Sequence, residues 1–415
     1  MKPTRTTIKL IKRFFSVGGS SVVNTKGRGI TGEIPSDRIV DFFYKDFDHL
    51  EFWSNNPKQS ALYYSSLFGF KIKETQDIYS KKNTAKYLLE NGNVRFLIIG
   101  PTSPENKNFD AFLNKHGDTV KGVGLKVDDV DKIYNHLKKN NWENIEIIED
   151  VNNGIRKLDI NMFGDITHTL IERNSNKAFW EGLSKDSENI PKLNVVNKMF
   201  TENGNEIPEF KRIDHVGFPQ ERNTSDSVLE KYYKDLGFYM FWYIDEKALS
   251  SKQSSLKSTV VSDFDNKIRF PIFEPIEKLK KSQIQEFLDF NGGAGAQHIA
   301  IEVDDILTTV KSMKNRGVEF LSCNESYYSL VFNKLNEYNI KLKEDLQEIK
   351  DLDILIDFDI DGNYLLQIFT KPVLDRPTLF LEFIQREGHE GFGEGNFNRL
   401  FLSIEQEQKK RGNLI

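Results

Sequence analysis

Two histidines and one glutamate stand at equivalent places in three strand-like segments of the C-terminal half. His215 begins HVGFP, His298 begins HIAIEV, and Glu382 lies inside the apolar run LFLEFI, with 83 residues between the first two and 84 between the last two. An ionised carboxylate in an apolar strand needs a cationic partner, because burying it unpaired is costly. Two imidazoles and one carboxylate on neighbouring strands form a facial triad, which binds Fe(II) and leaves positions open for substrate and O2.

The composition narrows the chemistry of such a site. The chain has one cysteine, Cys323, and seven histidines, so a metal site would be built from imidazoles and carboxylates. A single cysteine excludes an internal disulfide and is typical of a reducing compartment. A salt bridge remains an alternative for Glu382, because Arg376 and Arg386 lie close to it in sequence.

The elements that must position these residues recur along the chain. DFDHLEFW (46–53) is followed by ALYYSSLFGF (61–70), and RIDHVGFP (212–219) is followed by LEKYYKDLGF (229–238). Each pair predicts a strand opened by Asp-His, then a helix with two tyrosines, then a glycine where a left-handed helix cap is favoured.

A second motif is also duplicated. KGVGLKVDDVDKIYNHLKK (121–139) matches AQHIAIEVDDILTTVKSMKNRG (296–317), each a strand, an Asp-Asp helix start and an amphipathic helix. We therefore predict an α+β fold of four repeated β-α-β-β-β modules. Paired modules would form two open barrels, each a curved sheet around a cavity lined by alternate strand residues.

The repeats also predict the domain organisation. Residues 38–173 would form the N-terminal domain and residues 209–415 the C-terminal catalytic domain. The stretch between them, 174–208, is polar, irregular in period and rich in turn residues, which is typical of a linker.

The N-terminal domain keeps only part of the triad. Its Asp-His supplies His49, but Gly122 aligns with His298, and either Thr169 or Glu172 aligns with Glu382. We therefore predict a duplicated scaffold without a metal. Its remaining histidines are expected to be structural, as for His49 and His168, or to lie on the surface, as for His116 and His136.

Residues 1–32 differ in kind from the rest. They contain seven basic residues and no acidic one, and a helical projection separates apolar residues from basic ones. This composition is typical of a mitochondrial presequence, the alternative being a disordered arm on a cytoplasmic protein. The chain has no apolar run long enough to span a membrane, and its net charge of −5 does not favour nucleic-acid binding.

Long segments of the C-terminal half resemble the 4-hydroxyphenylpyruvate dioxygenases, a family of the vicinal oxygen chelate superfamily. The similarity extends over residues 38–415 and is densest in KKSQIQEFLDFNGGAGAQHIAIEVDDI, LLQIFTKPVLDRPTLFLEFIQR and GFGEGNFNRLFLSIEQEQKKRGNL. It implies Fe(II) ligation by His215, His298 and Glu382. It also implies conversion of 4-hydroxyphenylpyruvate and O2 to homogentisate and CO2 in tyrosine and phenylalanine catabolism, by a homodimer. The steps would be oxidative decarboxylation, ring hydroxylation and side-chain migration.

The resemblance further implies a set of substrate contacts and a lid. The lid would be a C-terminal helix over residues 396–410, capped by Asn396 after a glycine-rich segment. The substrate-binding positions that match the family are Ser258, Gln283, Gln297, Gln367, Phe369, Phe380, Phe392, Asn396, Phe397 and Phe401.

One position departs from the family pattern. The family has asparagine in the polar pocket wall where this chain has Phe273, which cannot form a hydrogen bond and takes more room. This leaves open 4-hydroxymandelate synthase, which shares substrate, metal and fold, although Phe369 favours ring attack over benzylic hydroxylation. A metal-free binding protein of the same fold is a further alternative. Extradiol dioxygenases and glyoxalases lack the segment GFGEGNFNRLF.

Overall fold

The computed structural model describes residues 30–32, 35–37, 39–76, 83–104, 106–174, 178–185, 189–244, 255–276 and 280–413. The basic segment that we interpret as a presequence or a disordered arm therefore lies, up to residue 29, outside the described residues. Residues 30–31 belong to the fold, because they form β1 (Ile30–Thr31), which pairs antiparallel with β11. For the residues before β1, the arm over residues 1–32 stays a prediction.

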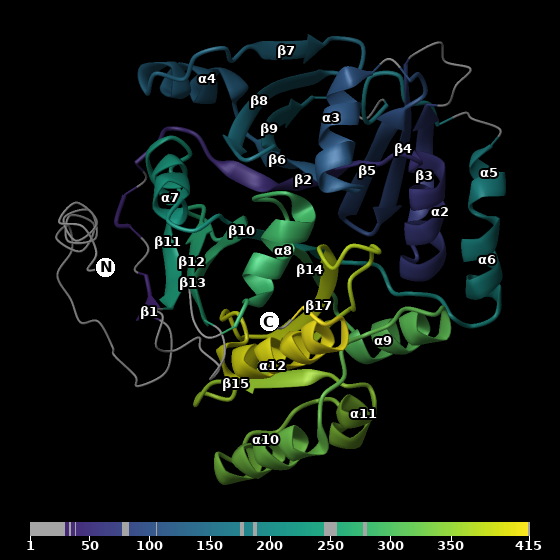
Figure 1. Ribbon diagram of the computed structural model, residues 1–415, viewed down its shortest axis with the longest axis vertical. Helices are drawn as coiled ribbons and strands as arrows, with labels where there is room; N and C mark the ends of the chain where they lie inside the picture. Colours follow the sequence, from purple (N-terminus) through teal and green to yellow (C-terminus); the bar gives the residue numbers. More distant parts are fainter. Residues whose placement is uncertain are drawn as a thin grey trace.

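The N-terminal half contains two of the predicted modules (Figure 1). The first consists of β2 (Tyr44–Trp53), α2 (Pro57–Phe68), β3 (Lys71–Gln76), β4 (Thr84–Asn91) and β5 (Val94–Pro101). After α3 (Lys107–His116), the second consists of β6 (Thr119–Val127), α4 (Val130–Lys139), β7 (Ile147–Asp150), β8 (Ile155–Phe163) and β9 (Ile166–Arg173). These strands form one sheet in the order β3-β4-β5-β2-β6-β9-β8-β7, in which β2 and β6 join the two modules.

The C-terminal half repeats this arrangement. Its first module is β10 (Arg212–Pro219), α7 (Ser225–Lys234), β11 (Tyr239–Ile244), β12 (Ser255–Ser262) and β13 (Arg269–Ile276), followed by α8 (Gln283–Asn291). Its second is β14 (His298–Glu302), α9 (Ile306–Asn315), β15 (Leu355–Phe358), β16 (Tyr364–Phe369) and β17 (Phe380–Glu387), with α10 (Glu325–Glu337) and α11 (Leu346–Asp351) inserted before β15. The sheet order is β1-β11-β12-β13-β10-β14-β17-β16-β15, and α12 (Glu394–Lys410) ends the chain. The predicted fold of four repeated modules is thus confirmed.

The stretch between the halves is more regular than its sequence suggests. It contains α5 (Ile190–Leu193) and α6 (Val195–Glu202), two short helices that the irregular period of the predicted linker did not indicate. Asn197 is the one buried residue of α6, and its polar contacts attach the helix to both halves. The side chain of Asn197 donates to the carbonyl oxygen of Phe70 at 3.2 Å and accepts from Arg316 at 2.9 Å. Such long-range contacts cannot be read from local periodicity.

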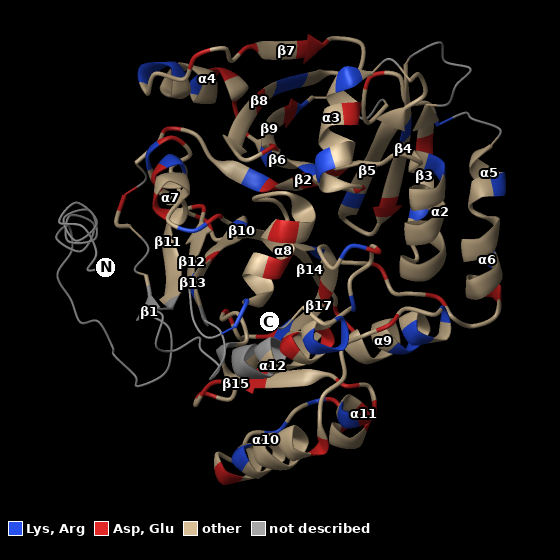
Figure 2. Cartoon of the chain, in the orientation of Figure 1, with Lys and Arg blue, Asp and Glu red and all other residues tan. Residues whose placement is uncertain are grey.

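Short-range signals position the helix ends as predicted. The side chains of Asp129 and Asp305 accept hydrogen bonds from the backbone of Lys132 and Thr308, so the second acid of each Asp-Asp pair caps its helix. At the end of α2, Gly69 has a φ of 72°, which is the left-handed cap expected from the glycine. Basic and acidic residues are interspersed along α4 and α7 (Figure 2).

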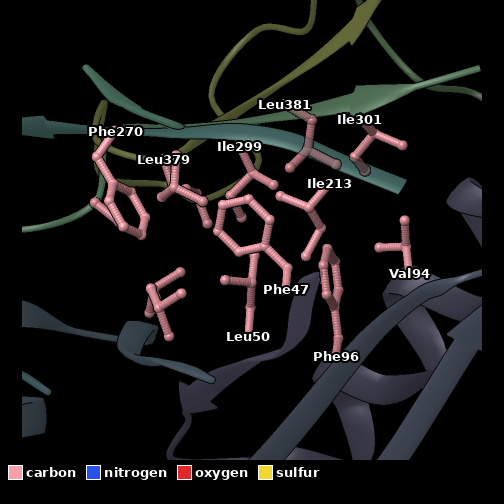
Figure 3. Packing of buried hydrophobic residues seen from close by; sticks show 14 of the residues in the cluster. Phe47, Leu50, Val94, Phe96, Ile213, Phe270, Ile299, Ile301, Leu379 and Leu381 are labelled. Atoms are coloured by element: carbon pink, nitrogen blue, oxygen red, sulfur yellow. The ribbon is translucent and has the colours of Figure 1, made fainter. Parts of the chain in front are cut away.

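A continuous apolar core joins the two halves. Phe47 and Leu50 of β2 face Ile213 of β10 and Ile299 of β14 across the interface (Figure 3). These side chains are at most 5% exposed, and they alternate along the strands with residues on the opposite face. The strands that carry the site residues are therefore held from behind by a large buried core.

Candidate metal centre

The structure brings the three predicted ligands together. One ligand atom from each of His215, His298 and Glu382 lies within 4.8 Å of the others, and Nε2 of His215 is 3.4 Å from a carboxylate oxygen of Glu382. The side chains of His215 and Glu382 are each 4% exposed. Two imidazoles and one carboxylate suit a divalent transition metal, and three ligands leave coordination positions for other molecules.

Strand register explains why the three side chains meet. β14 lies between β10 and β17, and its Ala300 is in register with both His215 and Glu382, while His298 is in register with Gly217. The site residues therefore share the inner face of the curved sheet. A Cβ atom on Gly217 would lie 2.0 Å from Cε1 of His298, so the imidazole occupies space that only glycine leaves free.

A buried ion-pair network orients His215. The register between β10 and β14 shifts next to Asp214, and this bulge lets adjacent residues of one strand interact. Oδ1 of Asp214 is 2.7 Å from Nδ1 of His215, and Arg386 binds both carboxylate oxygens at 2.8 and 2.9 Å. Burial would raise the pKa of Asp214, but Arg386 and His215 outweigh it and hold that pKa well below its usual range. An ionised carboxylate behind a ligand imidazole fixes its tautomer and raises its basicity.

Packing, rather than hydrogen bonding, orients His298. Its ring is stacked between Phe273 and Phe380, with centroids at 5.8 and 5.4 Å and interplanar angles of 13° and 15°. Its Nδ1 is buried without a hydrogen-bond partner among the described residues. Burial, and to a smaller extent His215, holds the pKa of His298 well below its usual range, so the imidazole is neutral. A neutral imidazole is the form that binds a metal.

The salt-bridge alternative for Glu382 is not supported. Arg386 is bound to Asp214, and Arg376 donates to the carbonyl oxygens of Lys115 and Phe290. The ion pair that Glu382 makes in the described part of the chain is with His215, the other candidate ligand. A cation bound between the two would therefore compensate the buried carboxylate.

Three of the predicted substrate contacts have buried polar atoms without a hydrogen-bond partner in the described part of the chain. They are Oε1 of Gln283 at the start of α8, Oε1 of Gln367 on β16, and Nδ2 of Asn396 on α12. An unsatisfied buried polar atom is costly, and in native proteins it often marks a place where a ligand or water binds.

The other predicted contacts lie as follows. Phe369 is in register with Glu382, Ser258 is in register with Phe273, and the ring of Phe392 is 5.1 Å from that of His215. Gln297 precedes β14 and bridges its neighbours through its backbone, donating to Gly217 and accepting from Phe380, each at 2.9 Å. Phe397 and Phe401 lie on α12, but their side chains are outside the described part of the structure.

The predicted cap of the lid helix was wrong. α12 begins at Glu394 rather than at Asn396, and its N-cap is Gly393, which has a φ of 75°. The side chain of Asn396 instead accepts a hydrogen bond from the hydroxyl of Tyr327 at 2.8 Å. This tyrosine lies on the inserted helix α10, so a tertiary contact replaces the local one.

Two buried arginines next to the site were missed. From the sequence we considered Arg386 only as a salt-bridge partner of Glu382. Arg173, at the end of β9, occupies the equivalent position in the N-terminal half. Arg269 is 1% exposed, pairs with Glu390 at 2.5 Å, and lies 4.7 Å above the ring of Phe241. Its Nε and Nη1 have no partner among the described residues. The recurrence of Asp-His and of an arginine in both halves could have revealed Arg386, whereas the sequence contains no clear signal for Arg269.

In the N-terminal half, the register decides between the two candidates for the third ligand. Gly122 and Gly124 of β6 are in register with Thr167 and Thr169 of β9, which places Thr169, not Glu172, at the position of Glu382. Thr169 donates to Asp159 at 2.7 Å. Within the described residues, the His-His-Glu group of the C-terminal half is the one cluster that could hold a metal.

The other histidines make structural contacts. Nε2 of His168 is 2.8 Å from the hydroxyl of Tyr232, between the two halves. His116 was expected on the surface, but it is 3% exposed and bonds to Asn291 and Asp165 of two other segments. His136 is partly exposed on α4.

The comparisons with known proteins agree with this geometry. A family model described as Glyoxalase/Bleomycin resistance protein/Dioxygenase superfamily matches residues 46–160 and 213–329. A mutant 4-hydroxymandelate synthase from Streptomyces coelicolor superposes with a TM-score of 0.72 at 23% identity, covering 88% of this chain and 99% of that one. The fold and the matched residues thus define a member of this superfamily.

Curated relatives narrow the class. The 4-hydroxyphenylpyruvate dioxygenase of Aspergillus fumigatus is 38% identical, with coverage of 93% of this chain and 98% of the relative. Those of Yarrowia lipolytica and Dictyostelium discoideum are 40% and 37% identical, and each alignment covers 89% of this chain and at least 94% of the relative. The chain belongs to the 4-hydroxyphenylpyruvate dioxygenase family and is an enzyme. None of the helices in its described residues is long and apolar enough to cross a membrane.

Proposed function

We propose that this enzyme uses Fe(II), held by His215, His298 and Glu382, to convert 4-hydroxyphenylpyruvate and O2 to homogentisate and CO2. The observation that carries the proposal is the meeting of these three side chains within 4.8 Å on the inner face of the C-terminal sheet. The names of the curated relatives support the substrate. The reaction balances without an external reductant, because the keto acid supplies the electrons as it loses CO2.

The side chains around the ligands account for binding and orientation. When bound, the metal supplies Lewis-acid binding of the keto acid and the redox chemistry that O2 requires. The unpaired amide oxygens of Gln283 and Gln367 can accept hydrogen bonds, for which the phenolic hydroxyl of the substrate is a donor. The rings of Phe369, Phe380 and Phe392 surround the ligands with apolar surface, which limits the access of water.

The test is O2 uptake by protein loaded with Fe(II) without oxygen and then given 4-hydroxyphenylpyruvate, with chromatography of the product. Homogentisate and CO2 in equal amounts to the O2 consumed are expected. No uptake by the iron-loaded protein would contradict the proposed substrate. Full activity with Mn(II), Co(II) or Zn(II) but not Fe(II) would contradict the proposed metal.

A second candidate activity is that of 4-hydroxymandelate synthase, which the superposed Streptomyces structure represents by fold alone. Phe369 lies beside Glu382 in the register of β16 and β17, so its ring borders the candidate metal position. A smaller aliphatic side chain would leave room for the benzylic carbon to approach. We expect Phe369→Ile to shift product from homogentisate toward 4-hydroxymandelate, and an unchanged ratio would remove Phe369 from the argument.

The location of the enzyme is a separate proposal. We propose that the basic segment up to residue 29 directs import into mitochondria, because it contains no acidic residue and has an amphipathic pattern. A fluorescent fusion lacking residues 1–29 should stay in the cytosol and keep its activity. Unchanged location would overturn the proposal.

The assembly state also remains a proposal. The resemblance to the family favours a homodimer. Sedimentation of the purified enzyme should give about twice the chain mass of 48.1 kDa, and a monomer at micromolar concentration would contradict it.

A further inference from the structure

One guanidinium connects a candidate metal ligand to the segment that precedes α12. Arg386 is the penultimate residue of β17, and its side chain is 6% exposed. Its Nε and Nη2 bind Asp214, which holds His215, while its Nη1 donates to the carbonyl oxygens of His389 and Gly391 at 2.8 and 2.7 Å. Four of its five N–H groups can donate in this way. Two of them bind the carboxylate of Asp214, and the other two bind carbonyl oxygens of residues 388–393, the 388–393 loop.

The 388–393 loop fits closely against the site. Phe392, at its end, places its ring 5.1 Å from that of His215 at an interplanar angle of 68°. A Cβ atom on Gly393 would lie 1.8 Å from Oε1 of Gln367, so the loop backbone touches the pocket directly. The loop is also fastened by Arg269, which pairs with Glu390.

We infer that Arg386 is a positioning residue that couples metal binding at His215 to closure of the 388–393 loop and α12. When the loop is closed, as in the structure, Arg386 is fixed on both sides and presents Asp214 to His215 in one orientation. If the loop opens, the guanidinium loses two of its acceptors and Phe392 leaves His215. By thermodynamic linkage, if closure of the loop raises metal affinity by some factor, metal binding raises the equilibrium constant for closure by the same factor.

The N-terminal half contains the same network, with Gly122 and Thr169 at the positions of the other two candidate ligands. Arg173 binds both oxygens of Asp48 at 2.7 Å, Asp48 holds Nδ1 of His49, and Nη1 of Arg173 donates to the carbonyl of Phe179. The segment that Arg173 fastens leads to α5 and α6 rather than to a helix over the site. A purely structural role would therefore give matching results for the two arginines, whereas coupling to the metal would appear at Arg386 alone.

The inference rests on the proposed metal site, and hydrogen exchange with Zn(II), which needs no turnover, tests it. In the unaltered full-length enzyme, Zn(II) should slow exchange of residues 388–396 at least about fivefold. In Arg386→Met, Zn(II) affinity should fall about 10- to 100-fold, as for other groups that orient a ligand. At saturating Zn(II) that variant should still bind, yet protection of residues 388–396 should fall below about twofold.

Two further variants separate coupling from general damage. Arg386→Lys keeps a cation against Asp214 but cannot reach all of the acceptors, so it should lose most of the metal-dependent protection; it carries the test if Arg386→Met does not fold. Arg173→Met should speed exchange at residues 178–185 and leave the response of 388–396 to Zn(II) unchanged.

The possible failures are distinguishable. Suppose that Zn(II) binds, that Glu382→Ala abolishes this binding, and that Zn(II) does not slow exchange at residues 388–396. This result would overturn the coupling and leave the proposed function intact. Full metal-dependent protection in both Arg386 variants would do the same. Zn(II) binding that is unchanged in Glu382→Ala would instead overturn the metal site itself, and the coupling with it.

Discussion

The two halves of this enzyme share modules, sheet order and a buried Asp-His-Arg network, yet one of them contains a metal-ligand cluster. The difference lies at two positions of matching register. His298 and Glu382 in the C-terminal half correspond to Gly122 and Thr169 in the N-terminal half.

This comparison separates what the fold requires from what the chemistry requires. His49 keeps its aspartate at 2.7 Å and contacts the rings of Phe179 and Trp180, although it belongs to no group of three candidate metal ligands among the described residues. The Asp-His-Arg network is therefore a property of the paired modules. A metal site arises where two more ligands are added to it.

The sharpest way to break the comparison is to remove a ligand and its counterpart. Glu382→Ala should lower turnover by more than about 100-fold and weaken metal binding, because two imidazoles alone are a poor site. Thr169→Ala should change neither. Metal content and O2 uptake measure both, with circular dichroism as the control for folding. Near-normal activity of Glu382→Ala would remove the difference between the halves.

A smaller effect is expected at the glycines against which the histidines pack. A Cβ on Gly217 would lie 2.0 Å from Cε1 of His298, and one on Gly124 would lie 2.4 Å from Nδ1 of His49. Gly217→Ala should displace His298 and weaken metal affinity about 10- to 100-fold. Gly124→Ala should cost about 1–3 kcal/mol of unfolding free energy and leave metal affinity unchanged. Titration calorimetry and urea unfolding distinguish the two effects, and equal losses of metal affinity would contradict the comparison.

The third difference between the halves affects the pH dependence of stability and not metal binding. His168 of the N-terminal half occupies the position that Leu381 has in the C-terminal half. Burial lowers the pKa of His168 to about 4. Since the unfolded chain binds this proton near pH 6.5, the contribution of neutral His168 to stability is complete above that pH and declines as the pH falls toward 4. The loss amounts to about 3 kcal/mol. His168→Leu should flatten the decline in unfolding free energy between pH 6.5 and 4, and an equal slope in both proteins would contradict this account.

Much of the fold and the ligand set could be predicted, because repeats and alternation are local signals. The equal spacing of His215, His298 and Glu382 reflects strands in equivalent positions, and the structure gives that spacing a geometric cause.

What the sequence did not predict depends on contacts between distant segments. The bond from Tyr327 to Asn396 crosses 69 residues, and the burial of His116 depends on Asn291, which is 175 residues away. The choice between Thr169 and Glu172 needed the register of β6 with β9. If the shared role of Arg173 and Arg386 had been known, aligning these two arginines would have identified Thr169 as the counterpart of Glu382.

The pairing of β1 with β11 sets a limit on how the N-terminus can be processed. Thr31 is in register with Trp242, and Gly32 donates to the carbonyl of Phe241 at 2.8 Å, so residues 30–32 cover the edge of an aromatic strand. If the proposed presequence were removed by cleavage before residue 30, this edge would stay covered. Cleavage after residue 32 would expose unpaired backbone groups on β11, and such an edge invites pairing between chains and aggregation. The short strand therefore protects an edge of the sheet that would otherwise be open to pairing between chains.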